Sequence, residues 1–104
     1  MELYRLKSFL SIARNKNLTR AAEQLNISQS ALSSQLKQLE EELDLALFER
    51  SSRGMFLTEV GQELVPLVNE LLAAEEHLLQ KAHALRHGGE ALNIGLNASP
   101  GFLR

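Results

Sequence analysis

Residues 18–37 read LTRAAEQLNISQSALSSQLK, and this stretch predicts two helices joined by a tight turn. Small apolar residues recur at helical spacing over residues 18–25, which indicates a short first helix. Asn26 follows, and asparagine tolerates the left-handed conformation that ends many helices. Ser28 is a suitable N-cap for a second helix that runs to about Leu43. Two such helices joined by a three-residue turn form a helix-turn-helix.

The second predicted helix carries two chemically different faces. Leucines spaced four, three and four residues apart form an apolar stripe of Leu32, Leu36, Leu39 and Leu43. A polar face lies on another side of the helical wheel and contains Gln29, Ser30, Ser33, Ser34 and Lys37. Glutamine can form two hydrogen bonds with adenine in the DNA major groove, and serine can bond base edges or phosphates. We expect this face and Ser28 to contact DNA; the alternative is an ordinary solvated helix face.

Shorter patterns on either side predict a further helix and a hairpin. Apolar residues recur at three- and four-residue steps over residues 3–13, as is typical of an amphipathic helix. Residues 45–50 and 55–58 are short apolar-rich stretches on either side of Ser51-Ser52-Arg53-Gly54. Because that tetrapeptide is rich in turn-forming residues, the region is predicted to be a small β-hairpin.

A long helix is predicted over residues 59–87, with Thr58 as its cap. We expect Gly88-Gly89 to end this helix. Residues 91–96 then alternate like a strand, but a single strand is not stable without a partner. The chain therefore resembles a fragment that stops just inside a second domain.

Composition excludes several classes of protein. The 104 residues are 44% hydrophobic and 23% charged, which is typical of a globular chain, and only 5% aromatic, which with abundant leucine favours packed helices. The absence of cysteine excludes disulfides, thiolate metal sites and thiol catalysis. No apolar run approaches the ~18 residues that a membrane helix needs. We expect a cytoplasmic protein without a membrane partner.

Positive charge is concentrated at the start of the chain. Residues 1–37 hold six basic side chains against two acidic ones, a net charge of +4, whereas residues 38–58 and residues 59–104 each carry −3. The total of −2 argues against a non-specific nucleic-acid binder. The basic first third favours DNA contact through the helix-turn-helix.

Several motifs resemble a known family in their order and spacing. Residues 18–33 resemble the signature of the LysR-type transcriptional regulators. The match continues through Leu39-Glu40, through LFER at residues 47–50 and through LTEVG at residues 57–61. It covers roughly residues 1–95, which makes it more specific than a general helix-turn-helix pattern.

The resemblance implies a mainly α fold with three parts. Residues 1–58 are expected to form a winged helix-turn-helix, with the helix-turn-helix at 18–37 and the wing at 45–58. Residues 59–88 are expected to form a linker helix that dimerises, and residues 89–104 the start of a truncated effector-binding domain. A small-molecule effector would bind only through the missing part of that domain. The full-length protein is expected to be a bacterial homodimer or a higher oligomer that requires no cofactor.

The resemblance also assigns individual residues. Gln29, Ser30 and Ser33 match positions where the family's recognition helix touches bases and backbone. The family commonly has Pro at the position of Ser30, Arg at that of Ser34 and Gly at that of Asp44. The serine at 34 removes a long cationic side chain, so base preference there is expected to differ, and Asp44 is expected to alter slightly the approach to the wing.

The hairpin tip resembles the family's wing. Arg53 is expected to enter a narrow, electronegative minor groove, unless it is an ordinary exposed arginine in a turn. Arg50 is expected to have a structural or phosphate-binding role near the base of the wing. Ser99 matches a position near the family's effector pocket.

An apolar stripe along the long helix predicts a dimer interface. Its leucines recur every seven residues, with further apolar residues beside them. The predicted interface residues are Leu64, Val68, Leu71, Leu72, Leu78, Leu79 and Leu85. Glu75 interrupts a parallel zipper pattern, and the resemblance implies antiparallel linker helices. The alternative is that the stripe packs only on its own winged domain.

Two other classes of protein are weighed against a DNA-binding regulator. An enzyme or metal site could use His83 and His87, four residues apart, with His77 nearby, but no third ligand is well placed and no catalytic motif is present. We therefore expect no metal and no catalysis. A coiled-coil protein-interaction adaptor without DNA binding is the remaining alternative, and it has no need for the basic first third or the Ser/Gln face.

Overall fold

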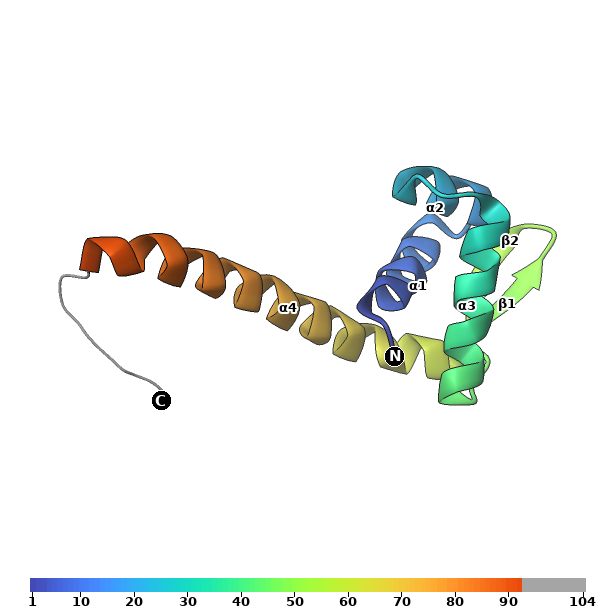
Figure 1. Ribbon diagram of the computed structural model, residues 1–104. Helices are drawn as coiled ribbons and strands as arrows, with labels where there is room; N and C mark the ends of the chain where they lie inside the picture. The colour runs from blue at the N-terminus through green and yellow to red at the C-terminus, as the bar shows by residue number, and fades with distance from the viewer. Residues whose placement is uncertain (93–104) are drawn as a thin grey trace. The chain divides into compact units, whose positions relative to one another are not determined.

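The computed structural model describes the backbone of residues 1–92 and the side chains of residues 1–87. The elements in chain order are α1 (Leu3–Asn15), α2 (Leu18–Leu25), α3 (Gln29–Leu43), β1 (Phe48–Ser51), β2 (Gly54–Leu57) and α4 (Glu59–Leu92) (Figure 1). The fold is mainly helical with one antiparallel hairpin, as the sequence predicted. The chain divides into two units after residue 72, and the winged domain lies in the first.

The helix-turn-helix forms because its helix ends are capped locally. The side chain of Asn17 accepts a hydrogen bond from the backbone N–H of Arg20 at the start of α2. Asn26 ends α2 in the left-handed conformation, with φ of 59°. Ser28 then caps α3, its Oγ accepting from the N–H of Ala31 at 3.0 Å. The predicted roles of Asn26 and Ser28 are thus confirmed.

A single apolar core joins the three helices to the hairpin. Ala21 and Ala22 are almost fully buried, so a larger side chain at either position would hold α2 away from its neighbours. The rings of Phe9 and Phe48 lie with centroids 5.5 Å apart and connect α1 to the wing. The largest fully buried side chains are those of Phe9, Ile12, Leu32, Leu39 and Leu47.

Buried serines of α1 make polar contacts with the helix-turn-helix. Ser11 donates its hydroxyl to Oε1 of Gln24 in α2 at 2.7 Å, and Asn15 donates its amide to the same oxygen at 2.8 Å. Ser8 donates to Oε1 of Gln35 in α3. Because buried polar groups are costly without partners, these contacts favour one placement of α2 and α3 on α1.

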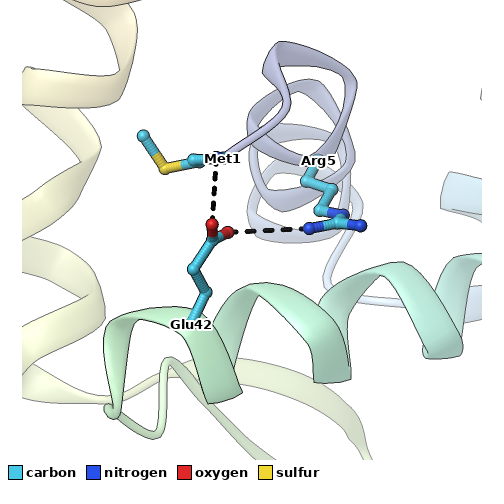
Figure 2. A network of polar contacts seen from close by, with 3 residues as sticks. All are labelled: Met1, Arg5 and Glu42. Atoms are coloured by element: carbon cyan, nitrogen blue, oxygen red, sulfur yellow. Dashed lines mark ion pairs between the residues drawn. The ribbon is translucent and has the colours of Figure 1, made fainter.

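The ends of α1 and α3 are joined by charge. The carboxylate of Glu42, near the end of α3, lies 2.9 Å from the α-ammonium group of Met1 and 3.6 Å from Nη1 of Arg5 (Figure 2). The three side chains are 20% to 38% exposed, so solvent screens both ion pairs. They add a modest electrostatic link to the apolar core.

The exit from α3 uses a left-handed residue. Asp44 has φ of 57° and ψ of 45°, a conformation that glycine adopts without strain and that aspartate tolerates. The side chain of Glu40 then turns back and accepts from the backbone N–H groups of Leu47 and Phe48, at 2.7 and 3.3 Å. These bonds connect the end of α3 to the first strand of the wing.

The wing is docked on the turn between α1 and α2. The backbone N–H of Met55 donates to the carbonyl of Lys16 at 3.1 Å. Gly54 stands beside this bond with φ of 132°, and a Cβ there would lie 2.2 Å from the same carbonyl oxygen. Lys16 itself has a positive φ of 54°. The close approach of the two backbones therefore requires glycine at position 54.

The first turn of α4 is held against the wing. Thr58 caps the helix as predicted, its Oγ1 accepting from the N–H of Gly61 at 3.1 Å, and it donates to the carbonyl of Ala46. A Cβ at Gly61 would lie 2.3 Å from the carbonyl oxygen of Leu47. The helix therefore begins in backbone contact with the segment that leads into β1.

The end of α4 differs from the prediction. The helix continues through Gly88 and Gly89 to Leu92, so the predicted stop at Gly88-Gly89 is wrong. Each glycine costs a helix only about 1 kcal/mol relative to alanine, and extending an existing helix adds a hydrogen bond for each residue. The strand predicted over residues 91–96 is wrong at its first two residues, which are helical; residues 93–96 lie outside the described residues.

Candidate nucleic-acid interface

The polar face predicted on the second helix of the helix-turn-helix is solvent-accessible on α3. On the other side of α3, Leu32, Leu36 and Leu39 are buried in the core. Of the predicted contact residues, Ser33 is half-buried and the others on the helix are exposed, namely Ser28, Gln29, Ser30, Ser34 and Lys37. The short side chains allow another macromolecule to approach the helix backbone closely. Their contact with DNA stays a prediction.

The N-cap of α3 and the first two residues of the helix have side chains that already have partners. Ser28 is engaged in capping, and its Oγ lies 3.3 Å from that of Ser30. Gln29 accepts at Oε1 a hydrogen bond from the hydroxyl of Thr19 in α2, at 3.0 Å. The carboxamide nitrogen of Gln29 therefore keeps its two N–H donors.

The wing presents two arginines beside this helix. Arg50 lies on β1, paired with Met55 of β2, and Arg53 lies in the turn, where its backbone N–H donates to Oγ of Ser51 at 3.1 Å. Both side chains are exposed, and within residues 1–87 neither guanidinium group belongs to an ion pair. Their charges are therefore available to an anionic partner.

Two neighbouring clefts separate the wing from the helix-turn-helix. One is lined by Thr19, Gln29 and Arg53 together with other residues of the wing. The second is lined by Ser33 and Lys37 of α3 and by residues of the wing. Arg50 and Met55 line both. The structure thus brings Gln29, Ser33 and Lys37 of α3 and both arginines of the wing to adjoining surfaces, although they come from distant parts of the chain. The other predicted contact residues, Ser28, Ser30 and Ser34, line neither cleft.

The apolar stripe of α4 has two different environments. Val68 is buried in the core of the winged domain, and Leu64, Val65 and Leu72 pack against that core while remaining partly exposed. The first part of the stripe therefore packs on its own winged domain, which was the alternative to a dimer interface. The exposed members are Leu71, Leu78, Leu79 and Leu85, which are between 42% and 66% accessible.

The remaining candidates from the sequence are the histidines of α4 and Ser99. The imidazole rings of His83 and His87 lie with centroids 4.3 Å apart. Among the described residues, no group of three histidines or carboxylates is arranged to hold a metal ion. Over the same residues, none of the helices combines the length and the apolarity needed to cross a membrane. Ser99 and the predicted start of the effector domain beyond residue 92 lie outside the described residues.

Three residues that line or support the candidate interface were not predicted from the sequence. Asn17 caps α2 and lines the first cleft, and an asparagine before a helix was a usable signal for this role. Thr19 contacts Gln29, and Lys16 provides the carbonyl that anchors the wing. Neither of these contacts has a sequence signal, because each depends on how segments pack in three dimensions.

The three-helix core, the antiparallel hairpin and the exposed polar face of α3 define a winged helix-turn-helix domain. The family model "Bacterial regulatory helix-turn-helix protein, lysR family" matches residues 3–62. The chain belongs to this family, and it is a DNA-binding transcription regulator. Membership favours DNA binding over the adaptor alternative.

Relatives and solved structures agree with this assignment. The transcriptional regulator BudR of Klebsiella aerogenes is 42% identical over 103 residues, which span 98% of this chain and 72% of BudR. The transcriptional activator AmpR of Citrobacter freundii is 38% identical over 91 residues, 88% of this chain but only 31% of AmpR. The protein chain in the crystal structure of the BenM_DBD/catB site 1 DNA complex is 32% identical in sequence to this chain. The two superpose with a TM-score of 0.79, and the match covers 83% of this chain and 97% of the BenM_DBD chain.

Proposed function

We propose that this chain is the DNA-binding and dimerising part of a longer regulator, and that it binds an interrupted inverted repeat as a homodimer. In each half-site α3 lies in the major groove and the tip of the wing enters the adjacent minor groove. The observation that carries this proposal is that Gln29 and Arg53 line one cleft. One segment of duplex placed over that cleft contacts both residues.

Each predicted contact residue has a role in this arrangement. Gln29 reads the edge of a base pair, and the short serines of α3 contact base edges or backbone oxygens. Lys37 and Arg50 line the second cleft and contact phosphates. Arg53 enters the minor groove, where a narrow groove has an enhanced negative potential. Ser34 supplies a hydroxyl in place of the family's cationic side chain, so it contributes less to affinity.

The exposed leucines of α4 support dimerisation. Leu71, Leu78 and Leu85 recur at seven-residue steps and are 42%, 66% and 62% exposed. Burying one leucine side chain contributes roughly 1.5–3 kcal/mol, so a second copy that covers the stripe is favoured. Because a two-fold protein symmetry requires a two-fold site, the DNA half-sites are inverted and spaced by about one helical turn or a multiple of it.

The remaining parts of the proposal concern the longer protein. Its relatives extend well beyond this chain, which spans 31% of AmpR. A small-molecule effector binds the domain that follows, and neither a cofactor nor a metal is required by the winged domain. The regulator acts in the bacterial cytoplasm, where its DNA is located.

Selection from a randomised duplex library tests the proposed site. The chain is incubated with the library, and the bound fraction is sequenced over several rounds. We expect an inverted repeat with an unselected spacer, flanked by A/T-rich positions where the wing contacts the minor groove. Recovery of a single unrepeated half-site, with one protomer bound per duplex, would contradict the proposed dimer.

Substitution of two exposed leucines tests the proposed interface. Changing Leu71→Glu together with Leu78→Glu places two charges on the stripe, and we expect monomers with a folded winged domain and sharply reduced affinity for the selected repeat. The matched control is Ala73→Glu together with Gln80→Glu, which adds the same charges seven residues apart on the opposite side of the helix. Analytical ultracentrifugation measures whether each double variant is a monomer or a dimer, and circular dichroism measures whether it is folded. A leucine variant that stays dimeric would place the interface elsewhere.

A further inference from the structure

One hydrogen bond joins the two helices of the helix-turn-helix at the position where we place base recognition. Thr19 is the second residue of α2, and Gln29 is the first residue of α3. The hydroxyl of Thr19 donates to Oε1 of Gln29 at 3.0 Å. Both side chains are exposed and line the cleft that also contains Arg53. The bond therefore lies on the surface proposed to face DNA.

The backbones that carry these two side chains are held in place by helix caps. Asn17 caps α2 through the N–H of Arg20 at 2.8 Å, and Ser28 caps α3 through the N–H of Ala31 at 3.0 Å. Thr19 and Gln29 both lie in the capped first turns. Forming the bond therefore requires only that two side chains settle into compatible rotamers, which limits its entropic cost.

The bond matters because a carboxamide has two chemically different ends. Its oxygen accepts and its nitrogen donates two hydrogen bonds, so an unrestrained glutamine can present either end to DNA. With the oxygen of Gln29 bonded to Thr19, the nitrogen is left to face the groove. In the major groove the N7 of a purine accepts a hydrogen bond, whereas the N4 amino group of cytosine only donates. An amide held in this way disfavours a cytosine, which offers it no acceptor, and can donate to the N7 of a purine or the O4 of a thymine on the strand that it faces.

We propose that Thr19 is a specificity-determining residue that acts through Gln29. Its hydroxyl orients the carboxamide before DNA arrives, so that Nε2 donates to the N7 of a purine. This inference rests on the proposed role of Gln29 in the major groove. The competing explanation is that Thr19 contacts a phosphate directly, and this contact would add affinity without sequence preference.

The test uses the duplex obtained by library selection, three single variants of the 104-residue chain and the double variant of Thr19 and Gln29. The base pair that Gln29 reads is identified as the position whose preference is lost in Gln29→Ala. Thr19→Val removes the hydroxyl and keeps the branched shape, and Thr19→Ser keeps the hydroxyl as the matched control. Fluorescence anisotropy measures affinity for the selected duplex, for duplexes changed at that base pair and for an unrelated duplex. Thermal unfolding by circular dichroism verifies that each variant is folded.

We expect Thr19→Val to reduce the preference at that base pair about two- to tenfold, the range expected for one hydrogen bond. Its affinity for the unrelated duplex stays unchanged, and Thr19→Ser retains the preference. In the Gln29→Ala background, Thr19→Val has no further effect, because residues that act as a unit are not additive. Replacing the purine with its 7-deaza analogue, which lacks the N7 acceptor, weakens binding of the unsubstituted chain more than that of Thr19→Val.

Two other outcomes overturn the inference, and they have different meanings. If Thr19→Val weakens binding to every duplex equally, or still weakens it in the Gln29→Ala background, Thr19 is a phosphate contact and only the inference fails. If Gln29→Ala changes no base preference, the proposed role of Gln29 fails and the inference fails with it.

Discussion

A methyl group added at Gly54 would collide with the backbone of the turn between α1 and α2. We expect Gly54→Ala to undock the wing from the turn between α1 and α2. A Cβ at this position would lie 2.2 Å from the carbonyl oxygen of Lys16, where ordinary contacts exceed about 3 Å. Backbone rather than a flexible side chain stands in the way, so the hairpin itself has to move.

The magnitude follows from two losses. The φ of 132° at Gly54 lies in a region that other residues occupy at a cost of about 1–3 kcal/mol. Moving the hairpin also breaks the hydrogen bond from Met55 to Lys16, which is 3.1 Å long and contributes about 0.5–1.5 kcal/mol. Together these predict a loss of about 1.5–4.5 kcal/mol in the free energy of unfolding, a large fraction of the 5–15 kcal/mol typical of small domains.

Urea unfolding followed by circular dichroism measures this loss, with Ser52→Ala as the control in the same turn. Ser52 is exposed, so its substitution is expected to change the free energy by less than about 0.5 kcal/mol. Because Arg53 adjoins Gly54, the Gly54→Ala variant should also bind the selected duplex more weakly under conditions where it is folded. A loss of stability below about 1 kcal/mol would refute the requirement for glycine at this contact.

Three further predictions concern the base of the wing, its tip and the charged end of α3. Gly61→Ala places a Cβ 2.3 Å from the carbonyl oxygen of Leu47, and we expect a loss of about 2–4 kcal/mol in urea unfolding; unchanged stability would show that α4 can shift freely. Arg53→Ala should weaken anisotropy-measured binding most on duplexes with A/T-rich flanks, whereas an equal loss on G/C-rich flanks would indicate a phosphate contact. Glu42→Gln removes the ion pairs with Met1 and Arg5 and should cost at most about 1 kcal/mol, decreasing with salt; a loss that is independent of salt would point to packing instead.

Much of the helix-turn-helix could be predicted because its determinants are local. The helix boundary at Asn26, the capping role of Ser28 and the buried leucines of α3 depend on residues within a few positions of one another. Capping and helical periodicity act over that distance, so both can be recognised in the sequence. The end of α4 was predicted wrongly for a related reason. Local preference alone favours a stop at Gly88, but propagation of the preceding helix outweighs it.

The limits of the interface could not be predicted, because they depend on which segments meet in space. A glutamine at the start of a recognition helix indicates base contact, but nothing in the sequence pairs Gln29 with Thr19. Leucines recur every seven residues along the whole of the predicted stripe on α4. Only the fold shows that Val68 is buried in the winged domain and that Leu78 is exposed.

The sequence alone determined the class of fold, the two faces of α3 and the apolar stripe of α4, because periodicity and caps are properties of neighbouring residues. Tertiary structure decided how these parts are joined. The docking of Met55 on Lys16 and the backbone approach that requires Gly54 link residues far apart in the chain. Such contacts form only when all the helices and strands are packed together, so the neighbouring residues in the sequence do not indicate them.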